Sequence, residues 1–90
     1  MAATSDILGE VPDVPPASTV VELDVRDLPP PEPMTETLER LAAMDEDGVL
    51  LQRNDRAPEF LFPKLRERGF EFGTVEAEES VYTAIWHAEA

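Results

Sequence analysis

The polar residues best suited to chemistry cluster after two short apolar segments of the chain. They are Arg26, Asp27, Arg53, Asn54, Asp55 and Arg56. Guanidinium groups bind carboxylates and phosphates, and paired carboxylates serve as acid and base in hydrolases. The residue types therefore fit an anion site built from the three arginines, or acid–base chemistry by the two aspartates.

Nucleophilic and metal chemistry have few residues to use in this chain. It contains no cysteine, so thiol, persulfide and disulfide chemistry are excluded, and its single histidine, His87, lies near the end of the sequence. Zinc needs three or four clustered ligands, and the acidic run at 45–48 lacks the alternating spacing of a calcium loop. We expect no catalytic residue, no metal site and no cofactor, and therefore a protein that is not an enzyme.

The composition is that of a strongly acidic protein with ordinary apolar content. Twenty Asp and Glu oppose seven Lys and Arg, which gives a formal net charge of −13, and 42% of the residues are hydrophobic. Nucleic-acid binding requires basic side chains that neutralise phosphates. No apolar run approaches the roughly 20 residues of a membrane span, and the first residues do not resemble a signal peptide. We expect a cytoplasmic protein that binds neither nucleic acid nor membrane.

The basic residues are concentrated in one segment. Between Arg53 and Arg68 there are five basic and three acidic residues, whereas the rest of the chain is acidic. Two interpretations remain open. The segment is an ordinary helix surface, with basic residues near the C-terminal end that the helix dipole favours, or it forms a local site for an anionic ligand.

The first 18 residues show no helical or strand period. Prolines at 12, 15 and 16 interrupt them, and small and acidic residues make up much of the remainder. We interpret residues 1–18 as a flexible acidic tail, or alternatively as a segment that orders on contact with a partner. The folded part is expected to be one domain over residues 19–88.

Apolar periodicity in the domain predicts four strands and two helices. The expected elements are a strand at 19–26, a helix from Pro33, a strand at 49–51, a helix from near Phe62 to Gly69, and strands from Phe70 and over Ser80 to His87. This order predicts an α+β fold, a two-layer β-α-β-α-β-β sandwich with a mixed four-stranded sheet. Right-handed crossovers place both helices on one face, so the other face is left open.

The last predicted strand is apolar on both of its faces. We expect the set that contains Tyr82 and Trp86 to pack under the helices, because its larger aromatic area gains more from burial. The open face then carries a candidate patch formed by Val81, Thr83 and Ile85. Contiguous apolar surface typically marks an interface, here with a partner or a second copy, and shielding by long neighbouring side chains is the competing account.

The run from Leu23 to Pro33, LDVRDLPPPEP, together with a helix, a short strand and the Asn54-Asp55-x-x-Pro58 loop, resembles the TusA/SirA-like superfamily. The resemblance covers Val20 to His87, is strongest to the uncharacterised, cysteine-free branch, and implies the TusA-like fold. Sulfur-carrier members have Cys-Pro-x-Pro at the start of the first helix. The matching residues here are Pro30-Pro31-Glu32-Pro33, so Pro30 stands where the cysteine would be, and the sulfur relay does not transfer with the fold.

Parallel strands end at the same edge of a sheet, where such folds usually place their sites. The candidate edge for a partner or ligand comprises Arg26, Asp27, Pro31, Pro33, Arg53, Asn54, Asp55 and Arg56. The leading hypothesis is a non-enzymatic interaction or adaptor domain that binds another protein, with weak homodimerisation as an option. The alternatives are a small-molecule or anion carrier that uses the three arginines, an enzyme that uses the two aspartates, and plain turn capping by Asp and Asn.

The charge pattern predicts a fold that depends on salt. Acidic residues are spread along the whole chain and only one basic residue, Lys64, is a lysine, a composition that resembles proteins of extreme halophiles; the rival interpretation is a docking surface for one basic partner. Self-repulsion fades when the Debye length shrinks to about 3 Å at molar salt. The melting temperature followed by circular dichroism should therefore rise between ~10 mM and ~2 M KCl. A flat melting temperature would contradict the repulsion argument.

Overall fold

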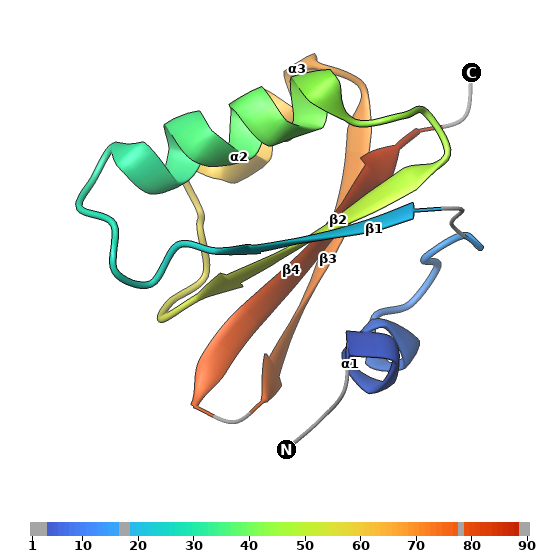
Figure 1. The fold of residues 1–90 in the computed structure, drawn as a ribbon, viewed down its shortest axis with the longest axis horizontal. Coiled ribbons are helices and arrows are strands. Elements are labelled where there is room, and N and C mark those ends of the chain that lie inside the picture. Colours follow the sequence, from blue (N-terminus) through green and yellow to red (C-terminus); the bar gives the residue numbers. More distant parts are fainter. Residues whose placement is uncertain (1–3, 17–18, 78, 89–90) are drawn as a thin grey trace.

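Four strands form one mixed sheet in the computed structural model, which describes residues 4–16, 19–77 and 79–88 (Figure 1). The elements are α1 (Thr4–Glu10), β1 (Thr19–Asp24), α2 (Glu32–Ala43), β2 (Gly48–Asn54), α3 (Leu61–Glu67), β3 (Phe70–Ala77) and β4 (Ser80–His87). β1 pairs with β2 in parallel, and β4 pairs antiparallel with both β2 and β3. The expected α+β class with a mixed four-stranded sheet is confirmed.

The order of the strands is β1-β2-β4-β3, so β4 lies between the two strands that α3 connects. Two successive β-α-β steps predict that β2 and β3 are parallel neighbours, and the structure places β4 between them instead. β4 takes the inner position because it is buried on both faces along Ser80–Trp86, whereas β3 alternates between exposed and half-buried residues. An alternating strand tolerates an edge position better than a strand that is apolar on both faces.

α2 and α3 cover one face of the sheet and form the first core with it (Figure 1). Its buried members are Leu41, Leu50, Leu61, Leu65 and Ile85. Phe62 extends this core by stacking on Phe72 at 4.5 Å between ring centroids. Pro63 falls in the first turn of α3, where its missing N–H removes no helical hydrogen bond. Gly69 ends the helix with φ +80°, as expected for the residue that follows a C-cap.

The prediction of an apolar patch on an open face of the sheet is wrong. Val81, Thr83 and Ile85 are 8%, 0% and 0% exposed, and Ile85 belongs to the core under α2 and α3. The aromatic set with Tyr82 and Trp86 lies on the opposite face. Pairing with β2 decides this, because Ile85 is paired with Leu50, which packs under the helices.

That opposite face is not open either, because the N-terminal segment covers it. We predicted a flexible acidic tail over residues 1–18, but residues 4–10 form α1 (Figure 1). Ile7 and Val11 are 1% and 4% exposed and pack in a second core with Tyr82, Trp86 and their neighbours. Residues 1–3 and 17–18 lie outside the described residues, and the prediction for them stays a prediction.

Truncating Ile85 tests whether this side chain is buried in the core between the sheet and the two helices. Ile85→Ala should lower the free energy of unfolding by about 2–5 kcal/mol, because it leaves a cavity between the sheet and α2 and α3. Val20→Ala is the matched control, since Val20 is 40% exposed on β1 and its truncation should change the stability by no more than about 0.5 kcal/mol. Urea unfolding of both variants measures the difference, and equal effects would contradict the burial of Ile85.

Candidate functional site

The loops that follow β1 and β2 lie at the same end of the sheet, on the left of Figure 1. Asp24 is the register partner of Arg53 at the ends of these two strands. The backbone N–H of Val25 donates to the carbonyl of Arg53 at 2.9 Å, which extends the pairing one residue into the β1–α2 loop. The polar residues of both loops are therefore brought to one edge, as the parallel arrangement predicts.

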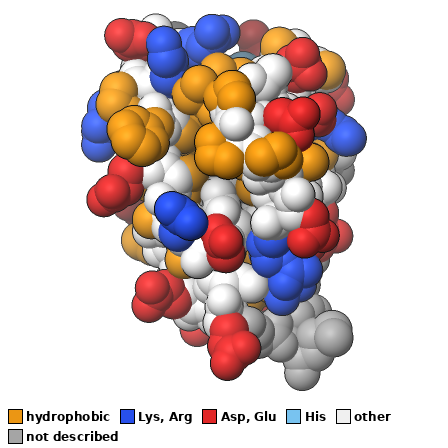
Figure 2. Space-filling model, turned by 90° about the vertical axis from the view of Figure 1, so that its left-hand side faces the viewer, with side chains coloured by type: hydrophobic (Ala, Val, Ile, Leu, Met, Phe, Trp, Pro, Cys, Tyr) orange, Lys and Arg blue, Asp and Glu red, His pale blue; other side chains and the backbone are white. Residues whose placement is uncertain are grey.

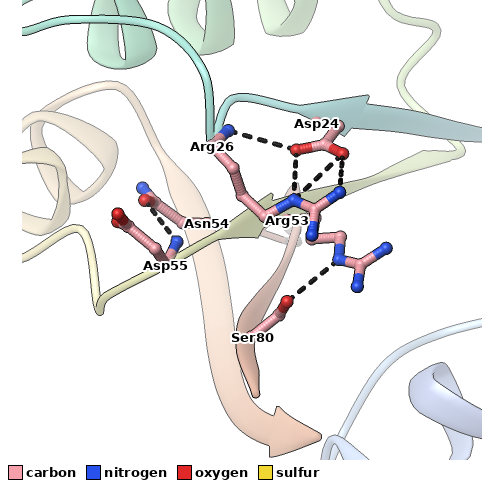
Figure 3. A network of polar contacts seen from close by, with 6 residues as sticks. All are labelled: Asp24, Arg26, Arg53, Asn54, Asp55 and Ser80. Atoms are coloured by element: carbon pink, nitrogen blue, oxygen red, sulfur yellow. Dashed lines mark hydrogen bonds and ion pairs between the residues drawn. The ribbon is translucent and has the colours of Figure 1, made fainter. Parts of the chain in front are cut away.

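Asp24 and Arg26 form a two-pronged ion pair at this edge (Figure 3). Arg26 Nε donates to Asp24 Oδ1 at 2.9 Å, and Arg26 Nη2 donates to Asp24 Oδ2 at 2.7 Å. The hydrogen bonds from the Arg26 side chain lower the pKa of Asp24, with a smaller contribution from the charge of Arg53. The same hydrogen bonds to Asp24 raise the pKa of Arg26. The Arg26 charge is thus already balanced by a carboxylate from the end of the preceding strand.

Arg53 is held by the start of β4 (Figure 3). Its Nε donates to Ser80 Oγ at 3.0 Å, and its guanidinium carbon lies 5.5 Å from the centre of the Tyr82 ring. Ser80 and Tyr82 are buried, so the half-buried Arg53 side chain is fixed on the sheet face that α1 also covers. Among the described residues, no carboxylate lies within ion-pair distance of Arg53.

The remaining predicted edge residues do not join this cluster. Arg56 is exposed and its Nε lies 3.6 Å from Oδ1 of its neighbour Asp55. Asp27 is exposed, and within the described ranges no hydrogen bond connects it with Asp55. The three arginines therefore make different direct contacts: Arg26 with Asp24, Arg53 with Ser80, and Arg56 with Asp55.

A buried chain of hydrogen bonds runs beneath the start of α2, on the other face of β2. Thr37 Oγ1 donates to the Pro33 carbonyl at 2.7 Å, and Gln52 Nε2 donates to Thr37 Oγ1 at 2.8 Å. Asn54 continues it weakly, since its Nδ2 lies 3.5 Å from Gln52 Oε1, while its Oδ1 accepts from the N–H of Asp55 at 2.8 Å. Asn54 thus has a structural role in joining β2 to the loop that follows.

The start of α2 is built from prolines. Pro31 is the N-cap, no side chain caps the helix, and the Pro30–Pro31 peptide bond is cis. Pro33 occupies the first turn, as predicted, and the Thr35 N–H donates to the Pro31 carbonyl at 3.1 Å. Pro30 and Pro31 are both exposed, so this helix start presents apolar rings to solvent rather than a reactive side chain.

Hydrophobic side chains gather at the end of the molecule where the two loops lie, with charged side chains around them (Figure 2). Phe60, which precedes α3, is 91% exposed, the largest exposure among the large hydrophobic side chains of the described residues. We call this the loop-end surface and define it by the exposed or half-exposed residues Leu28, Pro29, Pro30, Pro31, Ala57 and Phe60.

The described residues contain no group of three or more His, Asp or Glu side chains that would hold a metal ion. None of the helices in that part of the chain is long and apolar enough to cross a membrane. A shallow pocket lies around the edge strand β3, lined by Pro12, Asp13, Arg66, Phe70, Glu71, Phe72, Gly73 and Trp86.

Sequence reasoning missed three features of this region: the buried Gln52, the anchor of Arg53 and the exposure of Phe60. Gln52 carried a readable signal, since it follows Leu50 by two residues and so shares its buried face. Arg53 gave none, because its hydrogen-bond partner Ser80 is 27 residues away in the chain. Phe60 gave none either, because an apolar residue in a sequence is normally assigned to the core.

Comparison with known proteins yields one family. A family model described as "Uncharacterized conserved protein (DUF2249)" matches residues 22–87, which span the four-stranded sheet from Glu22 onward together with α2 and α3. No curated protein and no solved structure matches the chain.

The lowered pKa of Asp24 makes a small part of the stability depend on pH. A carboxyl group whose pKa is lower in the folded state stabilises the fold above its unfolded pKa of about 3.9, and this contribution is lost as the pH falls through the folded pKa. Asp24→Asn should therefore melt at a lower temperature than the wild type at pH 7, and the difference should disappear in acid. Asp55→Asn, in the looser Arg56 pair, is the control. The assignment would be refuted if the melting temperatures of Asp24→Asn and the wild type differed as much in acid, well below the folded pKa of Asp24, as they do at pH 7.

Proposed function

This chain belongs to the DUF2249 family, and we propose that it is a non-enzymatic interaction domain that binds another protein through the loop-end surface. The family match includes both loops that form this surface, whereas α1 precedes it. The proposal rests on the folded scaffold that the family shares and on the side chains that this chain presents from it.

The exposure of Phe60 is the observation that carries the proposal. Burying a phenylalanine side chain contributes about 1.5–3 kcal/mol, and Phe60 leaves nearly all of that unused at 91% exposure. A single exposed apolar residue means little, but Phe60 lies at the same end as the exposed rings of Pro30 and Pro31. Rigid proline rings and an aromatic anchor lose little conformational entropy on binding, which suits them to recognition.

The polar residues at this end support recognition rather than catalysis. Arg26 pairs with Asp24, Arg53 is bonded to Ser80, and Asn54 bonds the backbone of the loop. These interactions fix the shape of the edge, and none of them positions a nucleophile beside a base. The net charge of −13 of the whole chain favours a partner that is basic overall.

The finer features of the family assignment belong to this proposal as well. We propose a TusA-like fold, a cytoplasmic location and adaptation to high salt. The resemblance that starts at Val20 and the family match that starts at Glu22 cover nearly the same residues. The exposed Pro30 at the start of α2, where a sulfur carrier would place its cysteine, supports a role that has moved from group transfer to binding.

A second candidate function is transport of a small anion, and Arg53 is the observation that favours it. Its guanidinium is held by Ser80 and lies over Tyr82, so its orientation is already fixed before a ligand arrives. This candidate is weaker because Arg26 and Arg56 each lie beside a carboxylate. Only Arg53, of the three arginines expected to bind an anion, is therefore not paired with a carboxylate among the described residues.

Replacing Phe60 tests the first proposal. Phe60→Ser should leave the stability within about 0.5 kcal/mol of the wild type, because the side chain is exposed. As a central aromatic anchor, its loss should weaken binding of the partner by about 2 kcal/mol, or roughly 30-fold. Cross-linked capture at molar KCl from cells of the source organism, followed by affinity measurement with the purified partner, provides the readout.

Val20→Ser is the matched control, because Val20 is the other exposed large hydrophobic residue among those that the structure describes but lies on β1, away from the loop-end surface. A partner retained by the wild type and by Val20→Ser but lost from Phe60→Ser supports the proposal. Equal capture by all three proteins would count against it.

A further inference from the structure

The segment that carries α1 closes an apolar face that the rest of the fold leaves uncovered. That face is lined by Val49, Leu51, Tyr82, Ala84 and Trp86. Ile7 and Val11 seal it and are almost fully buried there, while Leu8 and Val14 pack at its margin. Figure 1 shows α1 on the side of the sheet opposite α2 and α3. The cover comes from a part of the chain outside the matched family region.

Gly73 of β3 forms the seat for this segment. A Cβ atom at position 73 would lie 2.6 Å from Val11 Cγ1, closer than Cβ atoms approach other atoms in folded proteins. The short, branched valine side chain has no flexible end that could bend away. Pro12 and Asp13 continue the contact, since they line the same pocket as Gly73 and Trp86. The face is therefore shaped to accept this particular segment.

α1 depends on the seat because it has little helical stability of its own. It has seven residues, well below the ~12–15 that an isolated helix needs. Gly9 lies inside it, and Glu10 places a negative charge at the negative end of the helix dipole. Asp13 has φ 67°, in the left-handed region that residues other than glycine rarely adopt. Release of the segment loses the buried contacts of Ile7 and Val11 and the marginal contacts of Leu8 and Val14.

The domain keeps a core when α1 leaves the sheet. The other face is packed independently by α2 and α3, which the chain connections hold in place on either side of β2. The buried side chains of that core are Leu41, Leu50, Leu61, Leu65 and Ile85. Opening of α1 therefore exposes one apolar face of a sheet that stays folded.

We propose that this face is an exchangeable docking surface and that the occupant competing with the chain's own α1 is the α1 segment of a second copy. Each copy carries the same seat and the same segment, so a reciprocal exchange restores every contact of Ile7 and Val11. Pro15 and Pro16 follow the docked segment and favour an extended connection that carries it away from its own sheet. Each copy has a net charge of −13, so the exchange requires the screening that molar salt supplies. The inference does not rest on the loop-end surface.

Two variants test the segment and its seat separately. Gly73→Ala blocks the docking of Val11 on β3 but leaves the α1 sequence unchanged. Ile7→Asp prevents α1 from packing on the apolar face but leaves β3 unchanged. Each alone should be monomeric, with emission from Trp86, the only tryptophan in the chain, at longer wavelength than in the wild type. Mixed in equal amounts at molar KCl, they should form a dimer of one copy of each, seen by light scattering, and the emission should shift back toward the wild-type position. The wild type itself should dimerise as its concentration rises.

Gly9→Ala is the matched control for Gly73→Ala, because no atom lies within 4 Å of a Cβ added at Gly9. It should leave Trp86 buried. If the Trp86 emission of Gly73→Ala is the same as in the wild type, the segment does not depend on Gly73 for docking, and this part of the proposal is wrong. If the mixture stays monomeric while both variants have an open face, the proposal that the α1 segment of a second copy docks there is wrong. Should Ile7→Asp fail to fold by circular dichroism, Ile7→Ala replaces it in the same mixture, where dimer formation again supports the second copy as occupant and a persistent monomer overturns it.

Discussion

β2 and β4 are hydrophobic on both faces, and excluding water from both faces at once is the constraint on which the structure depends. In β2, Val49 and Leu51 point one way and Leu50 the other, and all three are at most 3% exposed. A strand of this kind suits a central position, and one layer of helices covers only one of its two apolar faces. The sheet therefore places these two strands in its centre, with α2 and α3 over one face and α1 over the other.

The two covers differ in how the chain supplies them. α2 and α3 lie in the connections between strands, so the sheet cannot form in this order without placing them on one face. α1 precedes the sheet and belongs to no crossover, and its contacts with the apolar face are made largely by Ile7 and Val11. One face is thus covered permanently by topology, and the other by a segment that holds its place through side-chain packing.

At the loop end of the sheet, polar residues that could support chemistry instead hold the edge in a fixed shape. Parallel β1 and β2 bring Asp24, Arg26 and Arg53 to one edge, but each charged group is engaged by a neighbour, and the helix start holds proline rings. The buried Thr37–Gln52 hydrogen bond ties α2 to β2 directly beneath this edge. The result is a rigid end with an exposed Phe60, which supports our proposal of a recognition surface.

The sequence by itself determined the elements that local rules govern. The apolar run that follows a polar turn predicted β4 over Ser80–His87, a glycine marked the end of α3 at Gly69, and the absence of cysteine excluded thiol chemistry. Tertiary structure alone decided which face of β4 lies under the helices. A strand's period of two separates its side chains into two sets, but only the pairing of Ile85 with Leu50 says which set faces α2 and α3. The same holds for α1, since seven residues with an internal glycine carry too little helical propensity to be recognised without the apolar face that Ile7 and Val11 cover.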